Sequence, residues 1–317
     1  MNVVAVIVAY NRRPLLLEAL DAIKAQTLPV AATIVVDNAS TDGSGEAARQ
    51  HPSHPLVVAA NCNTGGAGGF AIGMDVALDQ GEPDYLWLMD DDTIPTPTAL
   101  LELMEAQRRY GAPVDILSSR AIWTDGRDHP MNTPRKRWRA DRVATARAEA
   151  IGAVPVRSAS FVSMLVSAEA VRRHGLPQAG FFIWNDDFEF SARILRDGVG
   201  LFVPSSVVEH RTKAFGSTDA DPGERFYYEV RNKIWMFGEK EIFAPLDRLA
   251  YGTSTLRRWA RTLAGSKQRG LLARSGARGV LDALTTRPRP TPMVIRDAIG
   301  PQAPVDRPWD DTEAPRW

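Results

Sequence analysis

A short run near residue 90 constrains the fold more than any other part of the chain. Residues 86–89 (Leu-Trp-Leu-Met) lead directly into Asp90, Asp91 and Asp92, which are followed by Thr93 and two prolines. An apolar run of this length with turn residues behind it is typical of a strand buried on both faces. Ligands of open α/β sheets collect at the carboxyl ends of such strands. The three aspartates are therefore expected at a ligand site.

Three adjacent carboxylates repel one another unless a cation joins them. A hard divalent ion with oxygen ligands, itself holding a substrate diphosphate, relieves this repulsion. An acidic surface turn is the alternative, and such turns are common. The triplet alone does not decide between the two, and the remaining motifs favour the metal site.

The first half of the chain alternates short apolar strands with stretches of helical periodicity. Strands are expected at residues 3–8, 33–37, 56–59, 84–89 and 115–122. A glycine-rich loop at 65–69 is expected to lead into one of the intervening helices. Repeated βαβ units predict an α/β fold with a doubly wound, mainly parallel, Rossmann-like sheet.

Composition limits the class of protein. The 317 residues are 44% hydrophobic and 24% charged, which is ordinary for one large folded α/β domain with an appendage. The single cysteine, Cys62, excludes an internal disulfide. The first ten residues lack a basic leader, and no apolar run reaches the roughly 18 residues that span a bilayer. We expect a cytoplasmic protein without a transmembrane anchor.

A second acidic pair, Asp186 and Asp187, lies among aromatic residues. Desolvation and like charge raise the pKa of at least one such carboxyl group, and this suits a general base. The pair also suits the first turn of a helix, where acidic residues favour the dipole. His210 ends another strand-like run; a lone histidine is usually structural, but this one is placed to complete the metal site.

Two further segments suit the binding of a nucleotide. Asp37 ends the second expected strand above a helix N-terminus, where a base or ribose is commonly read, although a helix cap there is better supplied by Ser40 or Asp42. Residues 65–69 hold four glycines in five positions and let a ligand approach the backbone. This segment lacks a Walker lysine and does not match the dinucleotide fingerprint.

In order and spacing these motifs resemble the family 2 inverting glycosyltransferases of the GT-A fold, over residues 3–240. The matching segments are residues 6–12, residues 35–40 and the aspartate triplet, which stands at the family's Asp-x-Asp motif. Residues 63–70, 184–189 and 227–232 look most similar to galactofuranosyltransferases and their rhamnosyltransferase relatives of actinobacterial cell-wall assembly.

The resemblance implies a role for each candidate residue in catalysis. Asp187 is implied as the general base, while Trp184 and Asp186 line the acceptor site. Asn185 departs from the family pattern, because it separates the tryptophan from the acidic pair and shifts the alignment by one residue.

The resemblance also implies how the donor is held. Asp90, Asp92 and His210 are expected to bind a divalent metal, Mg²⁺ or Mn²⁺. The residues expected to contact the nucleotide sugar are Tyr10, Asn11, Arg12, Asp37, Asn63, Gly65, Gly66, Asp90 and Asp91.

The implied activity is metal-dependent, inverting transfer of a sugar from a nucleotide donor. UDP-galactofuranose is the expected donor, and a glycan or a polyprenyl-linked glycan is the expected acceptor. Two alternatives stay open: a rhamnosyltransferase that uses dTDP-rhamnose, and a sugar-nucleotide-binding protein without turnover.

The domain boundaries follow from the resemblance and from charge. Residues 1–245 are expected to form the catalytic domain, with a nucleotide-sugar half at 1–125 and an acceptor half at 150–240. Residues 246–287 form a basic helical extension, and residues 288–317 a proline-rich, flexible tail. From residue 247 to 289, ten lysines and arginines stand against two aspartates. Such a segment suits an anionic membrane surface on the inner face of the cell membrane, or merely a solvated helix, rather than nucleic acid.

Overall fold

The computed structural model describes residues 1–300 except 138–140, 214 and 216–220. Within these residues one ten-stranded sheet runs through the molecule in the order β3-β2-β1-β4-β9-β6-β10-β8-β7, with β5 paired to β10. The strands are β1 Val3–Ala9, β2 Ala32–Asp37, β3 Leu56–Ala59, β4 Tyr85–Asp90, β5 Thr93–Pro95, β6 Ile116–Ile122, β7 Arg135–Lys136, β8 Val154–Ser158, β9 Met164–Ser167 and β10 Gly200–His210.

Strand direction agrees with the expected fold class. Parallel pairing joins β3, β2, β1 and β4, and again β6 and β10. β9 lies antiparallel between β4 and β6. The sheet is therefore mixed: its centre is mostly parallel, and antiparallel pairs add β5, β8 and β7 at one end.

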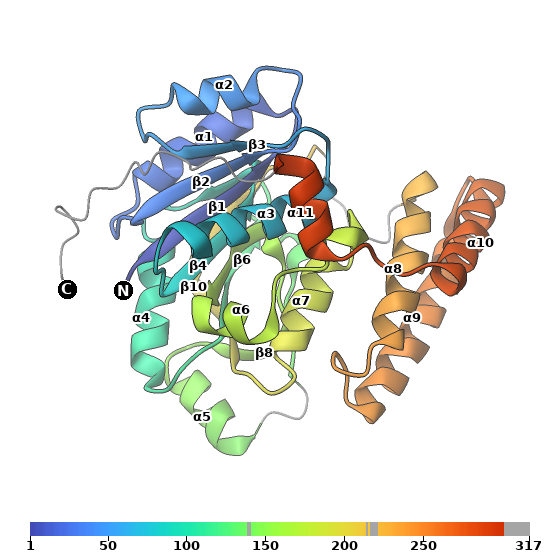
Figure 1. Ribbon diagram of the computed structural model, residues 1–317. Helices are drawn as coiled ribbons and strands as arrows, with labels where there is room; N and C mark the ends of the chain where they lie inside the picture. The colour runs from blue at the N-terminus through green and yellow to red at the C-terminus, as the bar shows by residue number, and fades with distance from the viewer. Residues whose placement is uncertain (138–140, 214, 216–220, 301–317) are drawn as a thin grey trace.

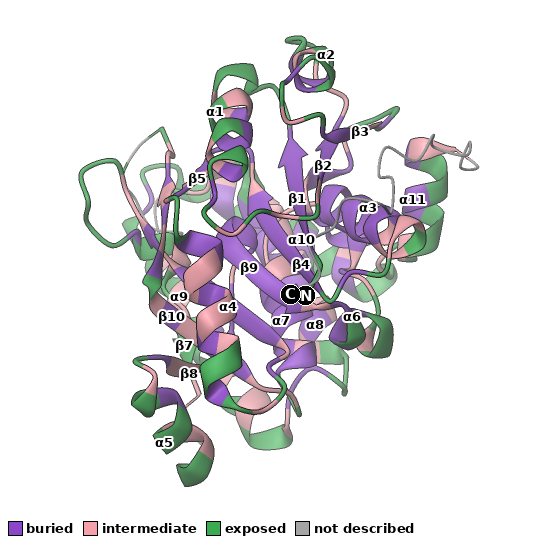
Figure 2. Cartoon of the chain, turned by 90° about the vertical axis from the view of Figure 1, so that its left-hand side faces the viewer, coloured by how far each residue is buried: buried purple, intermediate pink, exposed green. Residues whose placement is uncertain are grey.

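Helices cover both faces of this sheet (Figure 1). They are α1 Arg13–Lys24, α2 Ser44–Arg49, α3 Gly65–Gln80, α4 Ala99–Tyr110, α5 Arg142–Ala150, α6 Ala168–His174, α7 Asp186–Ile194, α8 Phe226–Gly238, α9 Pro245–Gly265, α10 Arg269–Thr285 and α11 Thr291–Ile299. Alternate residues of β1 explain the two layers: Val4, Val6 and Val8 join the core with α3, whereas Val3 and Ile7 join the core with α1 and α4. Figure 2 shows these central strands buried.

The glycine-rich segment is the first turn of α3 rather than the expected loop. Gly65 has a φ of 69°, and a Cβ built on it would lie 2.0 Å from the carbonyl oxygen of Phe182. A Cβ on Gly69 would lie 2.5 Å from Cγ1 of Val8. Glycine is normally unfavourable inside a helix, but here it lets the helix approach β1 closely. The loop prediction was wrong because it used local propensity without this packing.

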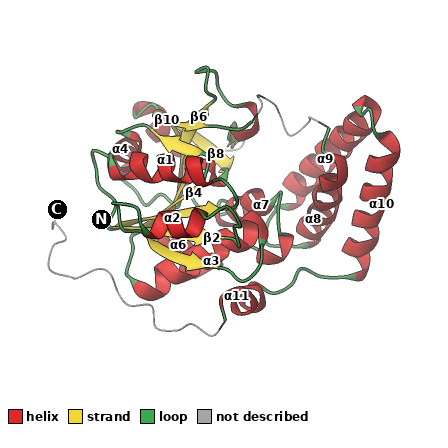
Figure 3. Ribbon diagram, turned by 90° about the horizontal axis from the view of Figure 1, so that it is seen from above, coloured by secondary structure: helices red, strands yellow, loops and turns green. Residues whose placement is uncertain are grey.

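The C-terminal helices form a layer beside the sheet domain, and α10 packs along α8 (Figures 1 and 3). Phe226, Val230 and Leu272 make a small apolar core between them. The basic extension is thus helical, as expected. None of the described helices is long and apolar enough to cross a bilayer.

The expected flexible tail is wrong for its first part. Residues 291–299 form α11, which returns to the sheet domain and lies against α3 (Figure 1). Val294, Ile295 and Ala298 are buried in the core with α3, and burial of such side chains stabilises the folded chain by an amount proportional to their apolar area. Prolines at residues 288, 290 and 292 therefore precede and begin a helix rather than mark disorder. Residues 301–317 lie outside the described part.

Candidate active site

The aspartate triplet and His210 meet at the carboxyl edge of the sheet. β4 ends at Asp90, and β5 pairs antiparallel with β10 so that Thr93 stands opposite His210. One ligand atom from each of Asp90, Asp92 and His210 lies within 4.8 Å of the others. This register brings together residues that are more than a hundred positions apart in the chain.

The three side chains fit a divalent cation. Oδ1 of Asp92 is buried and accepts no hydrogen bond, although Nε2 of His210 lies 3.3 Å away. Nδ1 of His210 is 2.8 Å from Oδ1 of Asn132, so Nδ1 donates to Asn132 and Nε2 is the ring nitrogen that faces Asp92. Two carboxylates and an imidazole with this orientation are suitable ligands for Mn²⁺ or Mg²⁺. Sequence reasoning had not identified Asn132.

Arg12 supplies positive charge to the triplet. Its guanidinium pairs with Oδ1 of Asp91 at 3.2 Å and also with Asp92. The second oxygen of Asp91 accepts the backbone N–H of Tyr10 at 2.9 Å, which ties the end of β1 to β4. Asp91 thus holds the ends of β1 and β4 together. The side chain of Arg12 binds the acidic triplet.

The three aspartates differ in their electrostatics. Burial, and then repulsion by Asp92, raises the pKa of Asp90 to about 6. Burial also raises the pKa of Asp91 to about 7, although the Tyr10 N–H and the charge of Arg12 both act to lower it. Burial opposes ionisation of Asp92 too, but His210 and Arg12 outweigh it, so its pKa is lowered. Asp92 is the carboxylate best prepared to bind a cation.

The donor-side candidates lie at the neighbouring strand ends. Oδ1 of Asp37 accepts the Ser40 N–H at 3.0 Å, and Oδ1 of Asn11 accepts the Thr41 N–H at 2.8 Å. Oδ1 of Asn63 accepts the Gly65 N–H at 2.8 Å. These bonds shape the turns that follow β1 and β2 and the start of α3.

Asn38, which sequence reasoning did not select, links these turns to α3. Its side-chain oxygen accepts the Thr64 N–H at 2.8 Å, and its amide donates to the carbonyl oxygen of Gly65 at 2.9 Å. It is fully buried. Its position directly after Asp37, in a segment that matches the family, was the available signal.

A cavity of about 360 Å³ joins the metal edge to the acidic pair. Six of the candidate residues line it: Gly66, Asp90, Trp184, Asp186, Asp187 and His210. The other candidates lie outside its lining, and they are Tyr10, Asn11, Arg12, Asp37, Asn63, Gly65, Asp91 and Asp92. The structure therefore brings the candidate base, two of the three candidate metal ligands and the candidate acceptor residues to one cavity, with the remaining candidates at adjacent strand ends.

Asp187 lies in the first turn of α7, and its Oδ1 accepts the Phe188 N–H at 2.6 Å. Burial raises the pKa of Asp187, while the Phe188 N–H, the Ser160 hydroxyl and Lys233 oppose the rise. Burial and the neighbouring Asp187 raise the pKa of Asp186 well above its usual range. The two carboxyl groups titrate as a pair, in which the Phe188 N–H, the Ser160 hydroxyl and Lys233 favour the ionised form of Asp187.

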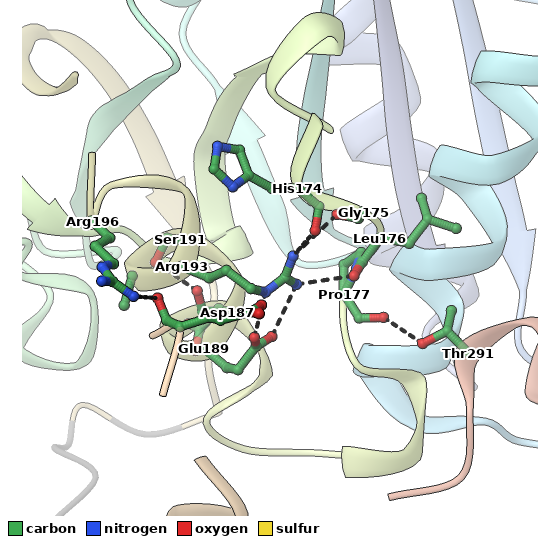
Figure 4. Close-up of polar contacts among 12 residues, drawn as sticks. His174, Gly175, Leu176, Pro177, Asp187, Glu189, Ser191, Arg193, Arg196 and Thr291 are labelled. Carbon is green, nitrogen blue, oxygen red and sulfur yellow. Dashed lines mark hydrogen bonds and ion pairs between the residues drawn. The ribbon is translucent and has the colours of Figure 1, made fainter. Parts of the chain in front are cut away.

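A hydrogen-bond network fixes α7 to the loop before it (Figure 4). Nε of Arg193 donates to Glu189 at 2.6 Å, and Nη2 donates to the carbonyl oxygen of Leu176 at 3.0 Å. Thr291, at the start of α11, donates to the carbonyl oxygen of Pro177 at 2.8 Å. The returning C-terminal helix thus helps to position the helix that carries Asp187.

The backbone before Asp187 is strained. Phe182, Trp184 and Asn185 have φ values of 68°, 68° and 65°, which non-glycine residues rarely adopt and which persist only where surrounding contacts enforce them. The buried amide of Asn232 in α8 donates to the carbonyl oxygens of Ile183 at 2.9 Å and Trp184 at 2.8 Å. Asn232 therefore holds the loop of residues 182–185 in place.

Replacing Asn232 with alanine is expected to lower the free energy of unfolding by about 1–3 kcal/mol, because buried carbonyl groups lose their donor. The release of Trp184 should also lower kcat more than it alters the affinity for the expected donor nucleotide. Thermal denaturation and steady-state kinetics measure the two effects, with the exposed Asn61→Ala as control. Wild-type stability and kcat in the Asn232 variant would refute this role.

Helix α8 and the first helix of the extension, α9, both contribute side chains to the cavity. Glu229 and Lys233 of α8 line it together with Arg258 and Trp259 of α9. Glu229 accepts from the guanidinium of Arg258, from Nε1 of Trp259 at 3.1 Å and from the amide of Asn185 at 2.8 Å. Arg258 and Trp259 were missed because the extension had been expected to be a separate element, whereas Glu229 and Lys233 belong to the expected acceptor half but were not singled out there. The four-residue spacing of Glu229 and Lys233 on the buried face of α8 was the signal for them.

Comparison with known proteins decides the family. The model of glycosyl transferase family 2 matches residues 4–170, more than half of the chain. The chain belongs to glycosyltransferase family 2. Galactofuranosyltransferase GlfT1 of Mycobacterium tuberculosis is 31% identical over 262 residues, which cover 75% of this chain and 83% of the relative. GlfT1 of Mycolicibacterium smegmatis is 31% identical over 205 residues, covering 62% and 66% of the two chains.

Solved structures give the same fold for this glycosyltransferase. S. aureus TarS 1–349 in complex with UDP-GlcNAc has a TM-score of 0.61 at 12% identity, covering 90% of this chain and 81% of that one. Mannosyltransferase PcManGT of Pyrobaculum calidifontis, in complex with GDP-Man and Mn²⁺, has a TM-score of 0.55 at 20% identity, covering 89% and 87%. These structures confirm the GT-A fold, while the family match and the GlfT1 relatives confirm the assignment as a glycosyltransferase.

Proposed function

We propose that this glycosyltransferase transfers galactofuranose from UDP-galactofuranose to a glycan or a polyprenyl-linked glycan, with inversion at the anomeric carbon. The observation that carries the proposal is that Asp187 lines the same cavity as Asp90 and His210. The GlfT1 relatives support the choice of donor sugar. A rhamnosyltransferase that uses dTDP-rhamnose is the second candidate, because the same groups would perform the same chemistry.

In the proposed reaction Asp187 accepts the proton of an acceptor hydroxyl. The acceptor oxygen attacks the anomeric carbon on the face opposite the nucleotide, and the bond to the diphosphate oxygen breaks. No covalent enzyme intermediate forms. Asp90, Asp92 and His210 would hold the divalent metal, which when bound offsets negative charge on the leaving diphosphate. Trp184 and Asp186 would line the acceptor subsite.

A panel of nucleotide sugars tests the donor. We expect metal-dependent release of UDP from UDP-galactofuranose to exceed release from UDP-galactopyranose, UDP-GlcNAc, GDP-mannose and dTDP-rhamnose. The measurement is nucleotide release by a coupled assay, with a crude lipid-linked glycan fraction as acceptor. Faster turnover of dTDP-rhamnose would assign the alternative activity. Tight UDP binding without release from any donor would indicate the non-catalytic alternative.

The exposed faces of α9 and α10 suit an anionic membrane surface, where a lipid-linked acceptor would be found, on the inner face of the cell membrane. Leu249 and Leu256 of α9 and Leu284 of α10 are 68%, 64% and 74% exposed. Exposed arginines accompany them, among them Arg257 and Arg261. Apolar side chains with flanking basic residues are typical of peripheral membrane helices.

Changing Leu249 and Leu256 together to glutamine is expected to lower the affinity for phosphatidylglycerol vesicles by at least about tenfold, since each buried leucine contributes roughly 1.5–3 kcal/mol. Vesicle sedimentation at low salt measures this, with Val143→Gln on the remote α5 as control because Val143 is 61% exposed. Equal binding of the wild-type protein to neutral phosphatidylcholine vesicles, or no binding at all, would eliminate the membrane role.

A further inference from the structure

Lys233 is a buried cation that the proposed reaction does not use. It lies on α8, is 3% exposed and lines the cavity next to the candidate base. Its Nζ lies 4.2 Å from the centroid of the Phe188 ring. In the described part of the chain it makes no ion pair and no side-chain hydrogen bond. A buried ammonium group without such partners is costly, so a function is expected for it.

The nearby acidic groups do not neutralise Lys233. Glu229, one helical turn earlier, is already paired with Arg258 and hydrogen-bonded to Trp259. Asp187 interacts with the charge of Lys233 without forming an ion pair. Burial lowers the pKa of Lys233 to about 7, and the charges of Arg258 and Arg135 act in the same direction. The charges of Glu229 and Asp187 act to raise it but do not outweigh burial. The ammonium group therefore lacks a counter-ion of its own.

Arg135 brings a second cation to the same place. Its guanidinium carbon lies 4.9 Å from the centroid of the Phe188 ring, the ring that Lys233 also contacts, and 5.6 Å from that of Tyr251. Arg135 belongs to the exposed strand β7, which is far from α8 in the chain, and it lines the same cavity as Lys233. Among the described residues it forms no ion pair. Two cations from distant segments thus converge at one aromatic ring without a paired anion.

We propose that Lys233 and Arg135 form an anion subsite beside Asp187, which binds a phosphate or carboxylate group carried by the acceptor. The subsite rests on the proposed function, because it places the acceptor at this end of the cavity. Charge-assisted hydrogen bonds from an ammonium and a guanidinium group are strong and suit both anions. Binding would supply the counter-ion that Lys233 lacks and would orient the acceptor hydroxyl toward Asp187.

Calorimetric titration of the full chain, saturated with UDP and Mg²⁺, tests the subsite. The probes are methyl phosphate, sodium glucuronate and the neutral methyl glucoside. We expect one of the two anions to bind at a single site and the glucoside to show no binding. Lys233→Met and Arg135→Gln should each weaken anion binding by about tenfold or more, whereas the exposed Lys24→Met should not. The preferred anion separates a phosphate from a carboxylate on the acceptor.

Two readouts keep this test independent of the proposed function. The affinity for UDP is measured in the same variants and should not change, since neither residue lies among the donor-side groups. Lys233→Met should keep or raise the melting temperature, because methionine has a similar volume to lysine and the substitution removes an unpaired buried charge. Anion affinities that are unchanged in both variants, or no anion binding by the wild type with UDP bound, would overturn the subsite. Failure of UDP binding in the wild type would instead refute the donor assignment.

Discussion

Replacing Asp187 with asparagine is expected to lower kcat by about 10²–10⁴-fold, the usual contribution of a general base. The substitution keeps the size of the side chain and removes its basicity. Its amide oxygen can still accept the Phe188 N–H that Asp187 accepts at 2.6 Å. The fold and the affinity for UDP should therefore be retained, as measured by thermal denaturation and by calorimetry.

Asp186→Asn is the matched control for this experiment. Burial and the charge of Asp187 raise the pKa of Asp186 well above its usual range, so the side chain is already close to a neutral hydrogen-bonding group. Asparagine should replace it with a much smaller loss of kcat. An inactive Asp186 variant together with an active Asp187 variant would reverse the assignment of the base.

Removal of the divalent metal is expected to abolish transfer. Treatment with EDTA should lower nucleotide release by about 10³-fold, because several kcal/mol of charge stabilisation on the leaving diphosphate are lost, and Mn²⁺ should restore it. Asp92→Asn and His210→Ala should behave like the EDTA-treated enzyme at any metal concentration. Asp79→Asn, on the exposed side of α3, should remain active.

The neighbour of His210 provides a graded test of the same site. Asn132 accepts from Nδ1 of His210 at 2.8 Å, and loss of such an orienting partner typically costs 10–100-fold in metal affinity or activity. Asn132→Ala should consequently require more Mn²⁺ for half-maximal rate while it approaches the wild-type rate at saturation. Full activity of Asp92→Asn in metal-free buffer would refute the metal site.

The sheet and its ligand edge could be predicted because short apolar strands carry their own signal. The run before Asp90 predicts the strand and places the triplet at its carboxyl end. The family resemblance adds roles for Asp187 and His210, which stay predictions. The first turn of α3 could not be predicted, because the glycines there serve a contact with β1 that no local pattern reveals. The same holds for α11, whose prolines suggested a flexible tail but whose apolar face packs on α3.

The supporting residues of the site were missed because they act across long separations in the chain. Asn132 contacts His210 across 78 positions, and Asn232 reaches the carbonyl oxygen of Ile183 across 49. In the sequence Lys233 looks like an ordinary polar residue of an amphipathic helix. The fold shows that it is buried and lines the cavity. Sequence spacing identifies residues that share one strand or one turn of a helix. Only the tertiary fold shows which residues of distant elements come into contact.

A crystal of the enzyme grown with UDP and Mn²⁺ tests the central claim most directly. The measurement is the anomalous difference map collected at the manganese absorption edge. We predict one strong peak, with Asp90, Asp92, His210 and the UDP diphosphate around the Mn²⁺ ion and Asp187 facing it across the cavity. A peak elsewhere, or UDP bound with no anomalous peak between Asp92 and His210, would contradict the account.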